Sequence, residues 1–202
     1  ILGMHKIQDR PMVINGEIEM TTKTEAPAHM EGTGIDTIIS GWHFRSDETQ
    51  QLQTDDFENQ GMIFVDQAMD IWDTAEGSEG KACSDCHADP ADSMAGVAAT
   101  YPKWNEDAGE LRTVQMQVND CRVNRMGADA WKYDATDAVS MEAMIASHSR
   151  GMPVDVAIDG PVAEAWEKGK EIYYTRYGQL ELACASCHEE NYGNYIRADH
   201  LS

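Results

Sequence analysis

Two copies of a five-residue motif carry the clearest chemistry in this sequence. Residues 83–87 run Cys-Ser-Asp-Cys-His, and residues 184–188 run Cys-Ala-Ser-Cys-His. C-x-x-C-H is the attachment signal for c-type haem, because two thiols form thioethers to the haem and the adjacent histidine ligates the iron. We therefore expect two covalently attached haem c groups. Their binding residues would be Cys83, Cys86 and His87 for the first, and Cys184, Cys187 and His188 for the second.

The fifth cysteine, Cys121, has no other thiol in the chain left to pair with. Arg122 is adjacent to it, and Arg125 lies one turn further along a short helix predicted over residues 114–126. Two neighbouring cations favour the thiolate, which is the form that binds metal. A thiolate ligand would stabilise ferric iron and lower the reduction potential relative to a methionine ligand.

The residues alone leave the second axial ligand of the first haem open. Methionine and histidine are common in that position, and a buried, inert thiol is the alternative role for the odd cysteine. The candidates are Cys121, Met94, Met116, Met126 and His148.

Helices must position the first motif. Apolar residues at helical spacing predict a helix over residues 55–72, with Asp55 and Asp56 at its start and Gly61 at a helix crossing. A second helix is predicted over residues 136–150, with Thr136 as N-cap. A helix followed by C-x-x-C-H and closed by a crossing helix is typical of small cytochrome c domains. We therefore expect a first haem domain over residues 55–152.

The second half repeats this plan. Pro161 occupies the first turn of a predicted helix that contains Gly169 and leads to the second motif. Taking Gly61 and Gly169 as equivalent, the first copy would carry about seven extra loop residues before its motif. The expected fold is mainly α, with two cytochrome c-like haem domains in tandem and a second domain truncated at the C-terminus. The remaining expected segments are an irregular extended arm with one or two short strands over 1–54, a linker over 153–160 and the start of the second domain over 161–202.

The composition excludes some classes of function. The chain carries 36 acidic and 15 basic residues, a formal net charge of −21. Such a charge disfavours binding to nucleic acid or to an anionic membrane surface. No apolar run approaches the ~20 residues that span a bilayer. The start of the chain lacks the features of a signal peptide, but haem c is attached outside the cytoplasm, so we expect a signal already removed and a periplasmic location.

Several segments beyond the haem motifs carry a family resemblance. The chain resembles SoxA, the dihaem subunit of the SoxAX cytochrome of bacterial sulfur oxidation, over nearly its whole length. The segments that carry the resemblance are residues 40–45, 55–59, 80–87, 121–126, 149–153 and 173–180.

The resemblance implies a partner, ligands and a reaction. The partner is the monohaem subunit SoxX, and the ligand opposite His87 is Cys121. The second haem corresponds to the family's active-site haem, whose other ligand is a modified cysteine beyond Ser202, so no catalytic residue is assigned here. The implied reaction joins thiosulfate oxidatively to a cysteine of the carrier SoxYZ and passes two electrons to a cytochrome c acceptor.

Two other classes of protein carry comparable motifs. A dihaem electron carrier without catalytic activity would have ordinary ligands at both haems. A dihaem peroxidase would need one haem with an accessible axial position.

Overall fold

The computed structural model describes residues 11–14, 17–20, 23–26, 30–197 and 199–201. The start of the chain, where a signal peptide would lie, falls outside the described residues. The chain divides into two compact units. One comprises residues 55–157, and the other combines residues before 55 with residues from 158 onwards. No helix in the described part of the chain is long and apolar enough to cross a membrane.

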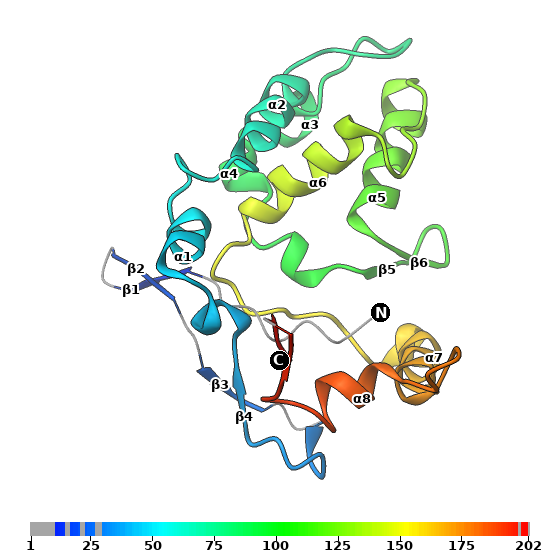
Figure 1. The fold of residues 1–202 in the computed structure, drawn as a ribbon. Coiled ribbons are helices and arrows are strands. Elements are labelled where there is room, and N and C mark those ends of the chain that lie inside the picture. The colour runs from blue at the N-terminus through cyan, green and yellow to red at the C-terminus, as the bar shows by residue number, and fades with distance from the viewer. Residues whose placement is uncertain (1–10, 15–16, 21–22, 27–29, 198, 202) are drawn as a thin grey trace. The chain divides into compact units, whose positions relative to one another are not determined.

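The described residues form mainly helices and short two-stranded antiparallel sheets (Figure 1). The α-helices are α1 Asp47–Thr54, α2 Met62–Trp72, α3 Ser84–His87, α4 Pro90–Ser93, α5 Val114–Cys121, α6 Thr136–Ser147, α7 Ala163–Tyr174 and α8 Cys184–His188. The strands pair as β1 Pro11–Ile14 with β2 Glu17–Met20, β3 Lys23–Glu25 with β4 Thr37–Ile39, β5 Lys103–Asn105 with β6 Glu110–Arg112, and β7 Tyr195–Ile196 with β8 Asp199–His200.

Packing of α2 against α6 forms the core of the unit 55–157 (Figure 1). Ala68 of α2 and Met144 of α6 are both 0% exposed, and Trp72 is 3% exposed. A methyl side chain at Ala68 lets the two helices approach closely. The prediction that Gly61 lies at the crossing was wrong, because Gly61 is the exposed N-cap residue of α2.

Both predicted helices of this unit are shorter than expected. Helix α2 begins at Met62 rather than Asp55, because the Asp55 carboxylate accepts a hydrogen bond from the backbone of Phe57 at 2.9 Å. Such a turn competes with helix formation. Thr136 is the first residue of α6 rather than its N-cap, which is Ala135. The same helix ends at Ser147, before the predicted stop.

The predicted short helix over 114–126 is present, in two parts. Helix α5 begins after Thr113, whose hydroxyl accepts a hydrogen bond from Met116 N, and it runs to Cys121. Residues Arg122–Met126 continue as a π-helical turn. Such turns are rare and are frequent at functional sites.

The same turn precedes both haem motifs. Glu76 bridges Lys81 before the first motif, and Tyr177 bridges Leu182 before the second, each pair joined by an antiparallel backbone bridge. The four intervening residues form a turn in both copies. The internal repeat therefore extends beyond the motif into the backbone that leads to it.

The predicted difference in loop length between the two copies was wrong. Helix α2 ends at Trp72 and α7 ends at Tyr174, so both motifs follow their helices after nearly equal intervals. Counting back from the first cysteine of each motif, Gly169 is equivalent to Ala68 and not to Gly61. The prediction was wrong because Ala68, and not Gly61, is the small buried residue at the crossing of α2 and α6.

Residues before 55 form more structure than the predicted extended arm. The sequence does not predict helix α1, because this helix buries none of its residues and so shows no apolar periodicity. Residues just before α1 contact residues that follow the second motif. Arg45 pairs with Asp199 at 2.7 Å, and the rings of Phe44 and His200 stack with their centroids 3.6 Å apart. Ile39 N also donates a hydrogen bond to Tyr192 Oη.

Gly77 allows the turn before the first motif to contact the chain after Met126, which provides a test of this packing. A Cβ atom at Gly77 would lie 2.2 Å from Met126 O, whereas a Cβ at Gly80 would have nothing within 4 Å. Both glycines have positive φ, at 73° and 58°. We expect Gly80→Ala to cost about 1 kcal/mol of unfolding free energy through backbone strain. Gly77→Ala should cost about 2–3 kcal/mol more, since it adds a steric clash.

Denaturant unfolding of the holoprotein measures this difference. Equal losses in the two variants would contradict the close approach at Gly77.

Candidate haem sites

A cavity of about 590 Å³ lies in the unit 55–157 beside the first motif. Its lining residues include Cys83, Cys86 and His87 of the first motif. Cys121, the last residue of α5, also lines it. Trp72, Val97, Val114, Met141 and Ile145 add apolar surface. The volume is within the roughly 300–1,000 Å³ typical of small-molecule and cofactor sites.

The first motif is held by α2 and by its own side chains. Trp72 Nε1 donates a hydrogen bond to Ala88 O at 2.9 Å, and the Trp72 and His87 rings lie 5.8 Å apart between centroids. The Asp85 carboxylate accepts a hydrogen bond from Ala82 N at 2.8 Å. Asp85, the second of the two variable residues in the motif, therefore fixes the start of the helical turn that carries the cysteines.

The structure separates the candidates for the second axial ligand. Cys121, Met94 and Met126 line the cavity with His87, whereas Met116 and His148 are not among its lining residues. Met116 is 42% exposed. Met94 and Met126 are buried at 8% and 5% exposure and contribute to the apolar packing.

A backbone junction joins the two walls of the cavity. Ser78 N donates to Gly127 O and Glu79 N donates to Met126 O, both at 3.1 Å. The Arg122 guanidinium, whose residue is 5% exposed, pairs with Glu76 at 2.7 Å. It also lies 3.8 Å above the Trp131 ring. Arg122 was expected to stabilise a thiolate at Cys121, but its charge is balanced by Glu76.

Burial controls the ionisation of the groups around the cavity. It raises the pKa of the Cys83 thiol, an effect opposed by Arg122 and reinforced by Cys121 and Glu76. Before any haem is attached, Cys83 is therefore a neutral thiol at neutral pH. Burial likewise raises the pKa of Tyr101, helped by negative charge at Cys121, so its phenol remains a hydrogen-bond donor.

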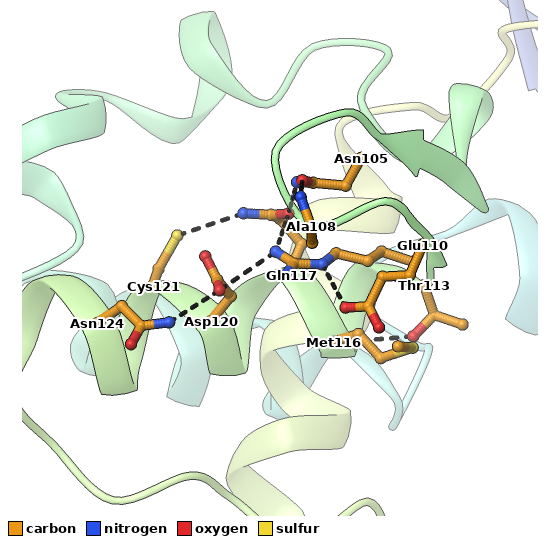
Figure 2. A network of polar contacts seen from close by, with 10 residues as sticks. Asn105, Ala108, Glu110, Thr113, Met116, Gln117, Asp120, Cys121 and Asn124 are labelled. Atoms are coloured by element: carbon orange, nitrogen blue, oxygen red, sulfur yellow. Dashed lines mark hydrogen bonds and ion pairs between the residues drawn. The ribbon is translucent and has the colours of Figure 1, made fainter.

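A polar network on α5 and the preceding strand reaches Cys121 through Gln117 (Figure 2). Gln117 Nε2 lies 3.8 Å from Cys121 Sγ, one helical turn along α5. Arg112 donates to Gln117 Oε1 at 3.2 Å and pairs with Glu110 at 2.9 Å and Asp120 at 3.2 Å. The sequence does not predict a role for Gln117 or Arg112. The only available signal was the spacing of Gln117 four residues before a cysteine.

The second motif lies on α8 with a similar local structure. Ser186 Oγ, at the position equivalent to Asp85, accepts a hydrogen bond from Ala183 N at 3.2 Å. Cys184 is exposed and Cys187 is partly buried. Unlike α2, the preceding helix α7 buries none of its residues.

Two tyrosines lie next to the second motif. Tyr174 Oη donates to Glu189 Oε1 at 2.8 Å. Burial, with the hydrogen bond and the charge of Glu189, raises the pKa of Tyr174 to about 12. Burial also raises the pKa of Tyr173, which takes the position equivalent to Trp72. Both phenols are neutral at physiological pH.

The residues around the first cavity fit a haem c. Two thiols and an imidazole on one short helical turn face an apolar cavity, and a sulfur atom lies on the other wall. No group of three or more His, Cys, Asp or Glu side chains in the described residues is arranged to hold a metal ion by itself. Cys83 and Cys86 would attach the haem, and His87 would ligate its iron.

Comparisons with known proteins agree with this geometry. Residues 67–154 match the family model described as SoxA/TsdA, cytochrome c domain. The chain is 59% identical over 194 residues to the L-cysteine S-thiosulfotransferase subunit SoxA of Rhodovulum sulfidophilum, covering 96% of this chain and 67% of that protein. It is 49% identical to the same subunit of Pseudaminobacter salicylatoxidans, covering 96% and 67%.

A solved structure shares the fold. The crystal structure of SoxXA from P. pantotrophus superposes with a TM-score of 0.85 at 51% identity, covering 93% of this chain and 70% of that chain. The protein is thus mainly helical, with a cytochrome c domain of the kind that carries covalent haem c. The chain spans about two thirds of the length of the relatives it matches. With 59% identity across nearly all of its residues, the chain belongs to the SoxA family.

Proposed function

We propose that the chain carries two haem c groups with different surroundings. The first would be attached to Cys83 and Cys86, with His87 and Cys121 as axial ligands. The cavity lined by all four residues supports this assignment. The second would be attached to Cys184 and Cys187, with His188 as one axial ligand. The repeated turn before both motifs supports a second site of the same kind.

We further propose two haem domains in tandem. The first would span 55–152, followed by a linker over 153–160 and the start of a second domain over 161–202, with residues 1–54 as an N-terminal segment. The start of a compact unit at residue 55 supports the first boundary. Helix α7 buries no residues, and Leu180 and Tyr177 beside the second motif are 78% and 59% exposed. These surfaces fit a second site whose opposite wall comes from outside the described residues.

The function that these observations support best is that of a subunit of an L-cysteine S-thiosulfotransferase. The single observation that carries it is the 59% identity over 96% of the chain to a SoxA subunit with that name. The protein would act in the periplasm with the monohaem cytochrome SoxX. Its substrates would be thiosulfate and a cysteine of the carrier SoxYZ.

The proposed reaction forms one sulfur–sulfur bond between thiosulfate and the carrier cysteine. The cysteine loses its proton, and two electrons leave for a cytochrome c acceptor. Bound haem supplies one-electron oxidation and reduction, with a potential that the axial ligands tune. This chain would hold the first haem in an apolar cavity, and its tyrosines next to Cys184 would remain neutral hydrogen-bonding groups.

Denaturing mass spectrometry tests the number of haems. The holoprotein should carry the mass of two, and the double variant Cys184→Ala, Cys187→Ala should carry one, because thioether attachment requires the thiols. The matched double variant Cys83→Ala, Cys86→Ala should also retain one. A single haem in the unmodified protein would contradict the proposal.

Cys121→Met tests the ligand opposite His87. Replacing a thiolate with a thioether should raise the potential of the first haem and alter its low-spin ferric EPR and absorption spectra. Met116→Leu, which changes an exposed methionine outside the cavity lining, is the matched control. Unchanged first-haem spectra in Cys121→Met would show that another residue is the ligand.

Activity is tested with the full-length protein in complex with its monohaem partner. We expect cytochrome reduction that requires both thiosulfate and the SoxYZ carrier, and loss of nearly all of it in the variant that lacks Cys184 and Cys187. A protein that exchanges electrons normally but never consumes thiosulfate would instead be a dihaem electron carrier.

A further inference from the structure

We propose that Gln117 is a positioning residue for the axial sulfur of the first haem. Its side-chain amide donates a hydrogen bond to Cys121 Sγ and so raises the reduction potential of that site. The inference rests on the proposed ligation by Cys121.

The amide and the sulfur face each other on one helix. Gln117 and Cys121 are separated by one turn of α5, and Nε2 lies 3.8 Å from Sγ, a distance suited to a long N–H···S hydrogen bond (Figure 2). Both residues line the cavity of the first motif. The donor therefore approaches the sulfur from beside the space where the haem would lie.

The network around Gln117 determines which end of its amide faces the sulfur. Arg112 has only donor groups, and its Nη1 lies 3.2 Å from Gln117 Oε1. Asn105 Nδ2 donates to the same oxygen at 3.3 Å. The Asn105 amide is itself oriented, because its Oδ1 accepts a hydrogen bond from Ala108 N at 2.9 Å (Figure 2). With Oε1 occupied by two donors, the NH2 group of Gln117 must face Cys121.

Arg112 strengthens this donor. Its residue is 9% exposed, and its guanidinium pairs with Glu110 and Asp120. The hydrogen bond to Glu110 raises the pKa of Arg112 above its ordinary value, so the charge persists at all physiological pH values. A fixed cation at Oε1 polarises the amide and makes its N–H groups better donors.

The direction of the effect follows from the charge on the sulfur. A hydrogen bond to the thiolate withdraws electron density that the sulfur would otherwise give to iron. Ferric iron is then stabilised less, and the reduction potential rises relative to a thiolate without a donor. One electron enters the iron on reduction, and the proton stays on the Gln117 amide.

Gln117→Met tests the inference in the holoprotein, because methionine has similar length and no donor. We expect the ferric-to-ferrous ratio of the first haem at a fixed potential to increase about tenfold, equivalent to a potential about 59 mV lower for one electron. The coupling of an exchangeable proton to the low-spin ferric iron, measured by pulsed EPR in H2O and D2O, should also disappear.

Gln115→Met is the matched control. Gln115 lies on the same helix and is 6% exposed, but its amide donates to Glu142 at 2.6 Å instead of to the sulfur. In Gln115→Met, the reduction potential and the proton coupling of the first haem should remain those of the unmodified protein. An unchanged potential in Gln117→Met, or an equal decrease in Gln115→Met, would overturn the inference.

The Cys121→Met spectra separate failure of this inference from failure of the proposed ligation. If Cys121→Met changes the first-haem signal and Gln117→Met does not, Cys121 is the ligand and Gln117 does not tune it. If Cys121→Met changes nothing, the ligation itself is wrong and this inference falls with it. Should Gln117→Met yield no holoprotein, Asn105→Leu removes one donor to Oε1 and should lower the potential in the same direction by less. An unchanged reduction potential in Asn105→Leu would show that the donors to Gln117 Oε1 do not orient its amide toward the sulfur.

Discussion

The backbone junction between residues 77–79 and 126–127 connects the two halves of the first site. Two hydrogen bonds of 3.1 Å join main-chain atoms directly, and a Cβ at Gly77 would lie 2.2 Å from Met126 O. At Gly77 the two backbones meet without an intervening side chain, so main-chain contacts determine the distance between the segments there. Because Cys83 follows one segment and Cys121 precedes the other, this junction sets the width of the cavity between them.

The ion pair beside this junction adds to its rigidity. Arg122 is nearly buried, pairs with Glu76, and stacks on Trp131. A buried cation that lost its partner would be strongly unfavourable, so the pair disfavours separation of the two segments. In a chain with net charge −21, this cation and Arg112 are used within the protein to orient groups around the cavity.

The two motifs show which features of a haem site are local. Each has the same bridge and turn before it, and each has a side chain that accepts a hydrogen bond from the residue before its first cysteine. These features depend on a dozen consecutive residues. The opposite wall of the first site comes from α5 and α6, which are distant in sequence. The local structure of the motif is therefore repeated, whereas the opposite wall of the first site depends on how the rest of that unit packs.

The sequence by itself predicted the haem attachment residues, and it determined the helices that precede them and the short helix that contains Cys121. These are local patterns, because motif spacing and helical periodicity involve residues close together in the chain. It could not reveal α1, which buries no residues, or the correct equivalence of Ala68 with Gly169. Only the tertiary structure decided that Cys121, Met94 and Met126 share a cavity with His87 while Met116 and His148 do not. It alone showed that Arg122 is balanced by Glu76, which lies far away in the sequence, and that Arg112 and Asn105 turn the Gln117 amide toward the sulfur.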